Sequence, residues 1–476
     1  MSLAKRVKFL IYCVKQLPFV FYSTFHYFLL SSFRDAKTRQ ELADLSLRIH
    51  LVTQVIKKST EDVDTVTLEQ TQGLLGGPQP PRKHEIAVPV KITSQQPAEI
   101  EAMVDAAVLG TCPEGIDKQQ LPKSVFAECK AEWQGTRLND TNTYESYLDG
   151  CKDKETVLLY FHGGGFMFGT EEGHRSLVAR LQNRFQGRAL SVRYRLSPQN
   201  QFPSALTDAL AAYQYLLHPP ADAVHQAVSA NQIVLGGDSA GGNLAIALYT
   251  LLVQQKQPLP AGLVLISPWL DLTHSFPSCR TKEHDYLPPM YPREAGTLLK
   301  QHRDSPSWPL QGRTRQVYTS DELLLHPLVS PVLVPELWKR LQASPRLCIQ
   351  MGSQEVLLDE NRDFARALTE VSDCLLYDEY RSMPHVFQVF GGQHKSALVS
   401  LDIMANFIKR ATLGQASGSA LFMRALPDVM ESLYHDTTLL AVRSLEEKQQ
   451  QMRAAIAEAE AHRHRMLDHK IRQARL

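Results

Sequence analysis

One short motif in this chain places a serine between two glycines, whose backbone freedom allows the sharp turn that exposes a nucleophile. Residues 237–241 read Gly-Asp-Ser-Ala-Gly, follow the apolar run 233–235 and precede a helical pattern over 243–248. The two glycines let a strand turn sharply into a helix, so that Ser239 stands exposed at the edge of a sheet. Glycines and serines also cluster in ordinary loops. The motif therefore needs a base, an acid and oxyanion donors before it indicates catalysis.

Candidates for the base and the acid follow two later strand-like runs. His385 comes just after the run 375–380, where a loop can carry an imidazole to the carboxyl edge of a sheet. Glu355 comes directly after the run 346–351, and we predict that it is the acid. Asp359 competes for that role from one helical turn further on. A serine hydroxyl is a weak nucleophile until a base takes its proton, so this serine–acid–histidine order predicts nucleophilic catalysis.

Backbone N–H groups are the natural donors for a developing oxyanion. Ala240 follows the candidate serine and supplies one such group. A second glycine run, 162–165, reads His-Gly-Gly-Gly and follows the strand-like run 156–161; Gly164 and Gly165 are the predicted donors there. We interpret His162 as a brace for this loop and not as the base. The four parts together predict a serine ester hydrolase.

The elements that would position these residues alternate along the chain. Unbroken apolar runs typical of buried parallel strands alternate with helical patterns over 177–185 and 205–217. This alternation predicts an α/β fold with a mostly parallel sheet that helices cover on both faces. The expected strands are 84–92, 131–133, 157–161, 189–194, 233–236, 263–268, 346–351 and 375–380. The pattern over 96–130 is ambiguous. The proline-rich insertion 269–344 is expected to form part of a cap over the site.

Composition narrows the classes of function. The chain has 476 residues, of which 43% are hydrophobic and 21% charged, and its net charge is +1. These are ordinary globular values, and the lack of a basic excess argues against nucleic acid as the main partner. Seven cysteines occur without a Cys-x-x-Cys, so the sequence predicts neither a disulfide framework nor a metal site.

The N-terminal region differs from the rest of the chain. Residues 16–33 carry no formal charge and follow several lysines and an arginine. Three interpretations stay open: a signal-anchor or membrane-embedded helix, an interfacial amphipathic helix, or a helix packed on the catalytic domain. We expect membrane association through residues 9–33, at the endoplasmic reticulum, with a cytoplasmic location as the alternative.

The chain divides into three predicted segments. The hydrophobic segment with a following helix occupies 1–65, a catalytic domain occupies 80–413, and a helical tail occupies 414–476. Residues 73–83 are rich in glycine and proline and predict a linker or surface loop. The stretch 437–476 has only a broken apolar stripe, which favours a solvated helix over a coiled coil.

Further motifs extend beyond the site. Residues 194–198 read Tyr-Arg-Leu-Ser-Pro, 267–272 read Ser-Pro-Trp-Leu-Asp-Leu, and 384–387 read Pro-His-Val-Phe. With the two glycine motifs, they resemble the hormone-sensitive-lipase-like group of α/β-hydrolases over roughly residues 85–412. The resemblance implies an α/β-hydrolase fold with an eight-stranded sheet and a cap built from N-terminal helices and the 269–344 insertion. It also implies ester hydrolysis through an acyl-enzyme, without metal or cofactor.

Two positions depart from that group, and the layout suggests a substrate. The group more often has Asp where Glu355 stands, and Glu is common where Gln199 stands. Members with an N-terminal membrane segment include arylacetamide and steryl deacetylases, so the resemblance implies small hydrophobic short-acyl esters, acetyl esters above all. Amide hydrolysis stays open, because the same machinery serves both bonds. A non-catalytic ligand-binding relative is the other alternative, although such relatives usually lack the histidine that His385 provides.

Overall fold

The computed structural model describes residues 51, 53–54, 68–137, 141–281, 285–287, 316–372, 374–415, 422–423, 446–454 and 457. The hydrophobic segment 9–33, on which membrane association was predicted, lies outside these residues. Across the described ranges, no helix is both long enough and apolar enough to cross a membrane.

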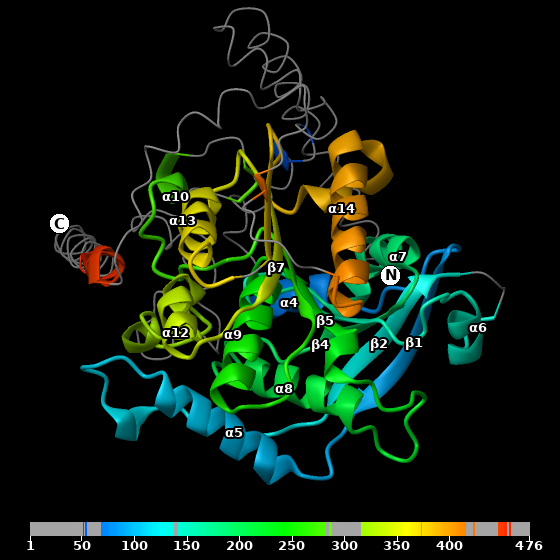
Figure 1. Ribbon diagram of the computed structural model, residues 1–476, viewed down its shortest axis with the longest axis horizontal. Coiled ribbons are helices and arrows are strands. Elements are labelled where there is room, and N and C mark those ends of the chain that lie inside the picture. Colours follow the sequence, from blue (N-terminus) through cyan, green and yellow to red (C-terminus); the bar gives the residue numbers. More distant parts are fainter. Residues whose placement is uncertain are drawn as a thin grey trace, which may run out of the picture.

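A single mixed sheet forms the centre of the molecule (Figure 1), and its strand order is β1-β2-β4-β3-β5-β6-β7-β8-β9. β2 pairs antiparallel with both β1 and β4, and all later pairings are parallel. The first eight strands form the sheet that the resemblance implied, and β9 adds two residues at the β8 edge. Their bounds are Glu85–Ile92, Cys129–Thr136, Val157–Phe161, Arg188–Arg193, Ile233–Asp238, Gly262–Ile266, Arg346–Gly352, Cys374–Tyr380 and Phe422–Met423.

Helices cover both faces of this sheet, as the alternating pattern predicted (Figure 1). α7 and α14 pack together on one face, and α5, α8, α9, α12 and α13 cover the other. The described α-helices are α4 (Leu68–Leu75), α5 (Pro97–Gly110), α6 (Tyr144–Asp149), α7 (Glu171–Phe185), α8 (Ser204–Leu217), α9 (Ala240–Gln254), α10 (Ser278–Thr281), α12 (Val334–Arg340), α13 (Leu358–Leu368) and α14 (Lys395–Thr412).

The central strands bury side chains on both faces because helices lie above and below them. In β3, Leu159 joins the core beneath α8 and α9, whereas Leu158 joins the core beneath α7 and α14. Successive side chains of a strand point to opposite faces, so one apolar run supplies two cores. This explains why the central strands read as unbroken hydrophobic runs.

The segment that the sequence pattern left unassigned begins with a helix. α5 starts with Pro97 and buries Ile100, Val104, Ala107 and Val108, a spacing that places them on one helical face. Proline suits the first helical turn because its missing N–H would have no partner there. The helical signal was therefore present in the sequence, although the segment as a whole fitted no single pattern.

The insertion 269–344 ends in the layer of helices that covers the sheet. α12 buries Trp338 completely, and the indole N–H donates to Thr250 of α9 at 3.1 Å. The Trp338 ring also packs edge-on against Tyr249. This part of the insertion therefore stabilises the domain itself, and residues 288–315 lie outside the described ranges.

A described part of the C-terminal tail packs against the domain. Residues 446–454 are helical, and Met452 is fully buried. Lys448 is buried and pairs at 2.8 Å with Asp363 of α13, whose side chain is 9% exposed. The expectation of a solvated helix is wrong for this stretch, because its sparse apolar and cationic side chains find specific partners that periodicity does not reveal.

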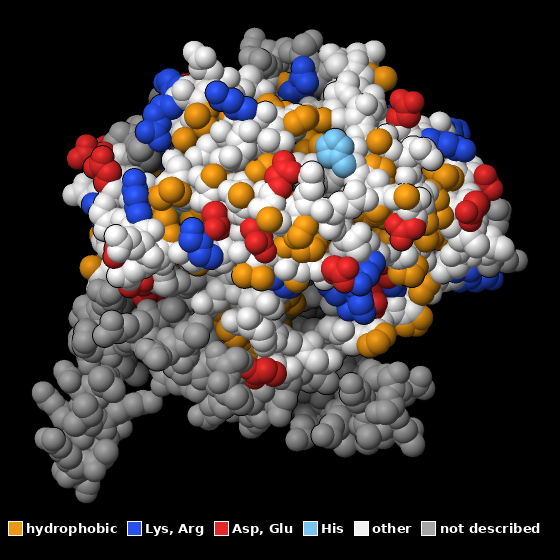
Figure 2. All heavy atoms as spheres, turned by 90° about the horizontal axis from the view of Figure 1, so that it is seen from below, with side chains coloured by type: hydrophobic (Ala, Val, Ile, Leu, Met, Phe, Trp, Pro, Cys, Tyr) orange, Lys and Arg blue, Asp and Glu red, His pale blue; other side chains and the backbone are white. Residues whose placement is uncertain are grey.

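The face that carries α5 shows how surface charge is distributed (Figure 2). Hydrophobic side chains are dispersed there among lysines, arginines and acidic residues. Charges of both signs lie close together, as the near-neutral composition implies. The described part of this face thus offers no basic stripe for a polyanion.

Candidate active site

The serine motif forms a sharp turn between β5 and α9. Ser239 has φ +53° and ψ −119°, a conformation that residues with side chains seldom adopt. Its N–H donates to the Ile266 carbonyl at 2.9 Å, which ties the turn to the end of β6. A Cβ at Gly237 would lie 2.4 Å from Gly241, and a Cβ at Gly241 would lie 1.9 Å from the Phe161 carbonyl oxygen. Both glycines are thus required by close backbone contacts.

The second glycine run leaves β3, the strand beside β5. Gly164 and Gly165 have φ +118° and +62°. A Cβ at Gly164 would lie 2.2 Å from the Phe168 carbonyl oxygen, so the loop folds tightly on itself. Because β3 and β5 are parallel and adjacent, both turns meet at one edge of the sheet. The structure therefore brings the two predicted donor loops side by side.

Asp238, whose role the motif left open, links these two turns. Its Oδ1 accepts hydrogen bonds from the Gly163 N–H at 3.0 Å and from the Tyr160 hydroxyl at 2.7 Å. Its Oδ2 lies 3.4 Å from Nε2 of His174. Burial by itself raises the pKa of Asp238, but the charge and hydrogen bond of His174, with the hydrogen bond of Tyr160 and the charge of His162, lower this pKa overall. The ionised carboxylate holds the glycine loop against the serine turn.

His162 has the features of a neutral structural histidine. It is buried, stacks on Tyr194 with ring centroids 4.3 Å apart, and places Nδ1 2.8 Å from the Gly163 carbonyl oxygen. Burial, with the neighbouring charge of His174, lowers the pKa of His162 to about 3. This geometry fits a brace for the glycine loop.

The predicted acid and base are in direct contact. Nδ1 of His385 lies 2.9 Å from Oε2 of Glu355, and both side chains are buried. The other oxygen of Glu355 accepts from the Ser267 hydroxyl at 2.6 Å and from the Gly352 N–H. Glu355 thus has a partner on each oxygen. Asp359, in the first turn of α13, instead accepts from the Ser278 N–H at 2.8 Å.

Electrostatics couple the two groups. Burial raises the pKa of Glu355, and the hydrogen bond and charge of His385 offset part of this rise. For His385, burial lowers the pKa, but the hydrogen bond and charge of Glu355, with the charges of Asp285 and Asp238, outweigh burial and raise it. The imidazole is therefore a stronger base than an ordinary histidine.

Ser267 contacts the loops of both the acid and the base, and the sequence did not predict this role. Its hydroxyl donates to Glu355 and accepts from the Val386 N–H at 3.1 Å, while its backbone N–H donates to Gln350. It has φ +46° at the end of β6, next to the serine turn. The Ser-Pro-Trp motif was the sequence signal for this position, but a motif does not say which side chain its serine contacts.

Aromatic side chains surround the two turns. Phe166, directly after the glycine run, stacks on Tyr318 with ring centroids 3.7 Å apart and lies 6.4 Å from Trp269. The backbone N–H of Trp269 donates to the Ser239 carbonyl at 3.0 Å, so Trp269 is fixed beside the turn. An aromatic cluster thus lies beside the glycine loop and the serine turn.

A cluster of three carboxylates among the described residues has a structural explanation. The carboxylates of Glu132, Glu171 and Glu172 lie close enough to hold a cation. Arg175 bonds Glu132 at 2.8 Å, and Arg193 pairs with the other two, so arginines already neutralise this cluster.

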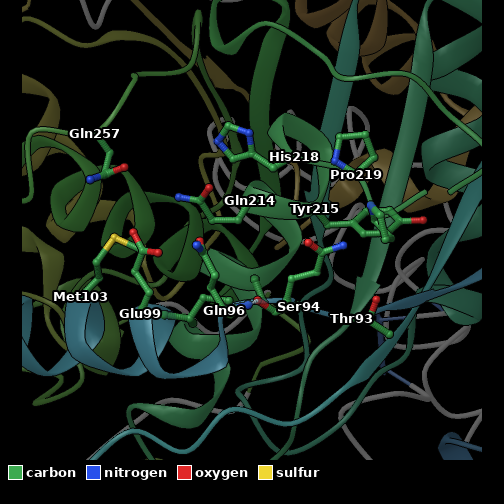
Figure 3. A pocket seen from close by; sticks show the side chains of 14 residues that line it. Thr93, Ser94, Gln96, Glu99, Met103, Gln214, Tyr215, His218, Pro219 and Gln257 are labelled. Atoms are coloured by element: carbon green, nitrogen blue, oxygen red, sulfur yellow. Dashed lines mark hydrogen bonds between the residues drawn. The ribbon is translucent and has the colours of Figure 1, made fainter. Parts of the chain in front are cut away.

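A polar hollow of about 330 Å³ lies between α5 and α8 (Figure 3). Gln96 and Glu99 on the α5 side face Gln214 and His218 on the α8 side. None of the predicted site residues lines it. Its amide and carboxylate lining is also a poor match for a hydrophobic ester, so it is separate from the candidate site.

Comparisons with known proteins bear on the family and the fold of this chain. Residues 158–389 match the family described as the α/β hydrolase fold. An acetyl-hydrolase of Streptomyces hygroscopicus is 30% identical over 60% of this chain and 81% of its own length. An esterase of Acinetobacter venetianus is 31% identical over 53% of this chain and 74% of its own. A solved hormone-sensitive lipase from a metagenome library is 26% identical, with a TM-score of 0.53 over 76% of this chain and 98% of that one.

The chain therefore belongs to the α/β-hydrolase fold family, within its hormone-sensitive-lipase-like group. The resemblance drawn from the motifs is confirmed, and so is the predicted fold class. Within that family, the chain is a carboxylic-ester hydrolase.

Proposed function

We propose that this hydrolase is a serine enzyme that works through an acyl-enzyme, with Ser239 as nucleophile, His385 as base and Glu355 as acid. The observation that carries the proposal is the 2.9 Å contact between Glu355 and His385. It lies at the same sheet edge as the strained serine turn, and Ser267 connects it to the end of β6, the strand beside that turn. The proposed nucleophile, acid and base thus follow three separate parallel strands, β5, β7 and β8, that end at one edge of the sheet.

The proposed reaction has two halves. In the first, the Ser239 hydroxyl attacks the ester carbonyl carbon while Nε2 of His385 takes its proton, and the alcohol leaves with that proton. In the second, water attacks the acyl carbonyl carbon while His385 takes its proton; the bond to Ser239 then breaks, Ser239 receives that proton, and the acid product leaves. Glu355 holds Nδ1–H and stabilises the imidazolium in both halves. Each half returns the base to its neutral form, so the cycle closes without a cofactor.

The oxyanion is proposed to bind the N–H groups of Gly164, Gly165 and Ala240. Two observations support these donors: the glycine loop and the serine turn leave adjacent parallel strands, and Asp238 bonds one to the other. Such donors are fixed before the reaction begins. Each is typically worth about 2.7–4 kcal/mol of transition-state stabilisation.

A small hydrophobic ester, with a short and preferably acetyl acyl group, is the proposed substrate. The buried aromatic side chains of Phe166, Tyr318 and Trp269 near the serine support a hydrophobic substrate. The acetyl preference rests on the acetyl-hydrolase among the relatives and on the motif resemblance.

The test is labelling with a fluorophosphonate probe, followed by hydrolysis of p-nitrophenyl esters from acetate to palmitate. Labelling should disappear in Ser239→Ala and persist in Ser372→Ala, whose hydroxyl bonds the Pro345 carbonyl in a turn before β8. Turnover should be highest for the shortest chains. Labelling that survives in Ser239→Ala would refute the nucleophile, and a maximum at palmitate would refute the acyl preference. Matched ester and anilide substrates decide between ester and amide hydrolysis.

Membrane association through residues 9–33 remains a proposal from the sequence, together with the domain division at 1–65, 80–413 and 414–476. The uncharged stretch and the preceding basic residues support it. Carbonate extraction of the full chain tests it: retention in the membrane pellet is expected, and complete release would refute an embedded segment.

A further inference from the structure

A buried aspartate from the insertion contacts both loops that carry the proposed acid and base. Asp285 is fully buried. Its Oδ2 accepts from the Val356 N–H at 3.0 Å, and its Oδ1 accepts from the His385 N–H at 3.1 Å and from the Tyr286 N–H at 2.8 Å. All three donors are backbone N–H groups, so these bonds do not depend on the rotamers of the donor residues.

Two of these bonds join loops that leave different strands. Val356 follows Glu355 in the loop after β7, and His385 lies in the loop after β8. The contact between Glu355 and His385 crosses the same gap. One carboxylate therefore fixes the separation of the two backbones whose side chains must stay in contact.

The charge of Asp285 also faces the imidazole. Burial raises the pKa of Asp285, and the positive charge of His385 and the bonds from backbone N–H groups offset only part of this rise. The other groups that face His385 are Glu355, Asp238 at the end of β5, and the Tyr286 ring, which lies edge-on with centroids 5.8 Å apart. Among the described residues, no lysine or arginine forms an ion pair with Asp285, so the imidazolium is the cation that this carboxylate would serve.

We propose that Asp285 is a positioning residue of the active site, one that clamps the acid and base loops together and places a second negative charge beside His385. This inference rests on the proposed serine mechanism. It assigns a task to a residue in the irregular insertion that no sequence motif singled out.

The experiment compares two substitutions that separate the clamp from the charge. Asp285→Asn keeps the size of the side chain but removes the charge and turns one acceptor into a donor that opposes a backbone N–H. Asp285→Glu keeps the charge but changes its reach. Asp359→Asn is the matched control, because Asp359 also accepts a backbone N–H nearby without facing His385. Initial rates with p-nitrophenyl acetate are measured across pH for each protein.

For Asp285→Asn we expect kcat to fall about tenfold to a hundredfold, with KM changed less than about twofold. Because the lost charge favoured the protonated imidazole, the acid limb of kcat/KM should move about one unit toward lower pH. Asp285→Glu should lower kcat while the acid limb stays in place. Asp359→Asn should match the wild type in both respects.

If the acid limb does not move in Asp285→Asn, the proposed electrostatic effect of Asp285 on His385 is refuted. If kcat equals that of the wild type, the proposed role of Asp285 in holding the two loops together is refuted. If Asp285→Asn does not fold, Asp285→Glu decides: kcat and KM equal to the wild type would overturn the proposal, and a loss confined to kcat would support it. Fluorophosphonate labelling of the wild type separates this inference from the proposed mechanism. Labelling that does not depend on Ser239 refutes the mechanism itself, whereas Ser239-dependent labelling with an unaltered Asp285→Asn variant refutes only the role of Asp285.

Discussion

Replacing Glu355 by glutamine should disable the base while leaving the fold intact. Oε1 of Glu355 accepts from both the Ser267 hydroxyl and the Gly352 N–H, and Oε2 faces Nδ1 of His385. A hydroxyl can rotate to accept a bond, but a backbone N–H can only donate. The glutamine oxygen must therefore face Gly352, and the amide NH₂ must face His385.

That arrangement reverses the tautomer of the His385 imidazole. Nδ1 would have to accept from the amide, so the proton would move to Nε2, where a lone pair is needed to receive the Ser239 proton. The wrong tautomer in a comparable triad costs about 10⁴ in kcat. We expect Glu355→Gln to lower kcat by about 10³- to 10⁴-fold, or about 4–5.5 kcal/mol of transition-state stabilisation.

The assay is steady-state hydrolysis of p-nitrophenyl acetate, with thermal unfolding to show that the variant is folded. Asp359→Asn provides the control, because it makes the same chemical change in the rival acid. It should retain activity within about twofold, as substitutions away from critical contacts usually do. A loss below about tenfold in a folded Glu355→Gln variant, or an equal loss in Asp359→Asn, would refute the assignment and the reasoning from Gly352.

Three further results are expected. The kcat/KM of the wild type should fall as pH falls through the raised pKa of His385, because a protonated base cannot accept a proton; a midpoint at or below the ordinary value of 6.5 would contradict this. Gly164→Ala should lower kcat by at least about a hundredfold, since its Cβ would meet a carbonyl oxygen, whereas Gly115→Ala, with a similar positive φ but open space around it, should leave kcat unchanged. Met452→Ala should lower the free energy of unfolding by about 2–5 kcal/mol in a urea titration, and an unchanged midpoint would show that residues 446–454 do not pack on the domain.

Local sequence patterns were sufficient for most of the sheet and for the serine turn. The strand predicted at 157–161 occupies those residues, and the strand predicted at 346–351 extends by one to Gly352. Buried parallel strands need unbroken apolar runs, and a sharp turn needs glycine at fixed offsets, so both leave signals within a few residues. The order of serine, acid and histidine followed from their places after three strand-like runs, which are β5, β7 and β8 in the structure.

The tertiary structure decided which acid meets the base. Glu355 and Asp359 follow the same strand, and their residue types do not distinguish them. The loop after β7 holds Glu355 in contact with His385, whereas Asp359 lies in α13 and accepts a hydrogen bond from Ser278. This choice depends on the path of the backbone in space, which no local pattern encodes.

The sequence by itself determined the fold class, the family and the candidates for the triad, with two acids still in competition, because each rests on a short motif or on a position after a strand-like run. Only the tertiary structure revealed the links between loops: Asp238 on the glycine run, Ser267 on Glu355, and Asp285 on the loops of the acid and the base. When a buried carboxylate accepts hydrogen bonds from main-chain N–H groups, the residues that donate can have any side chain. Such a contact leaves no paired signal along the chain, so it becomes visible only when the loops are folded together.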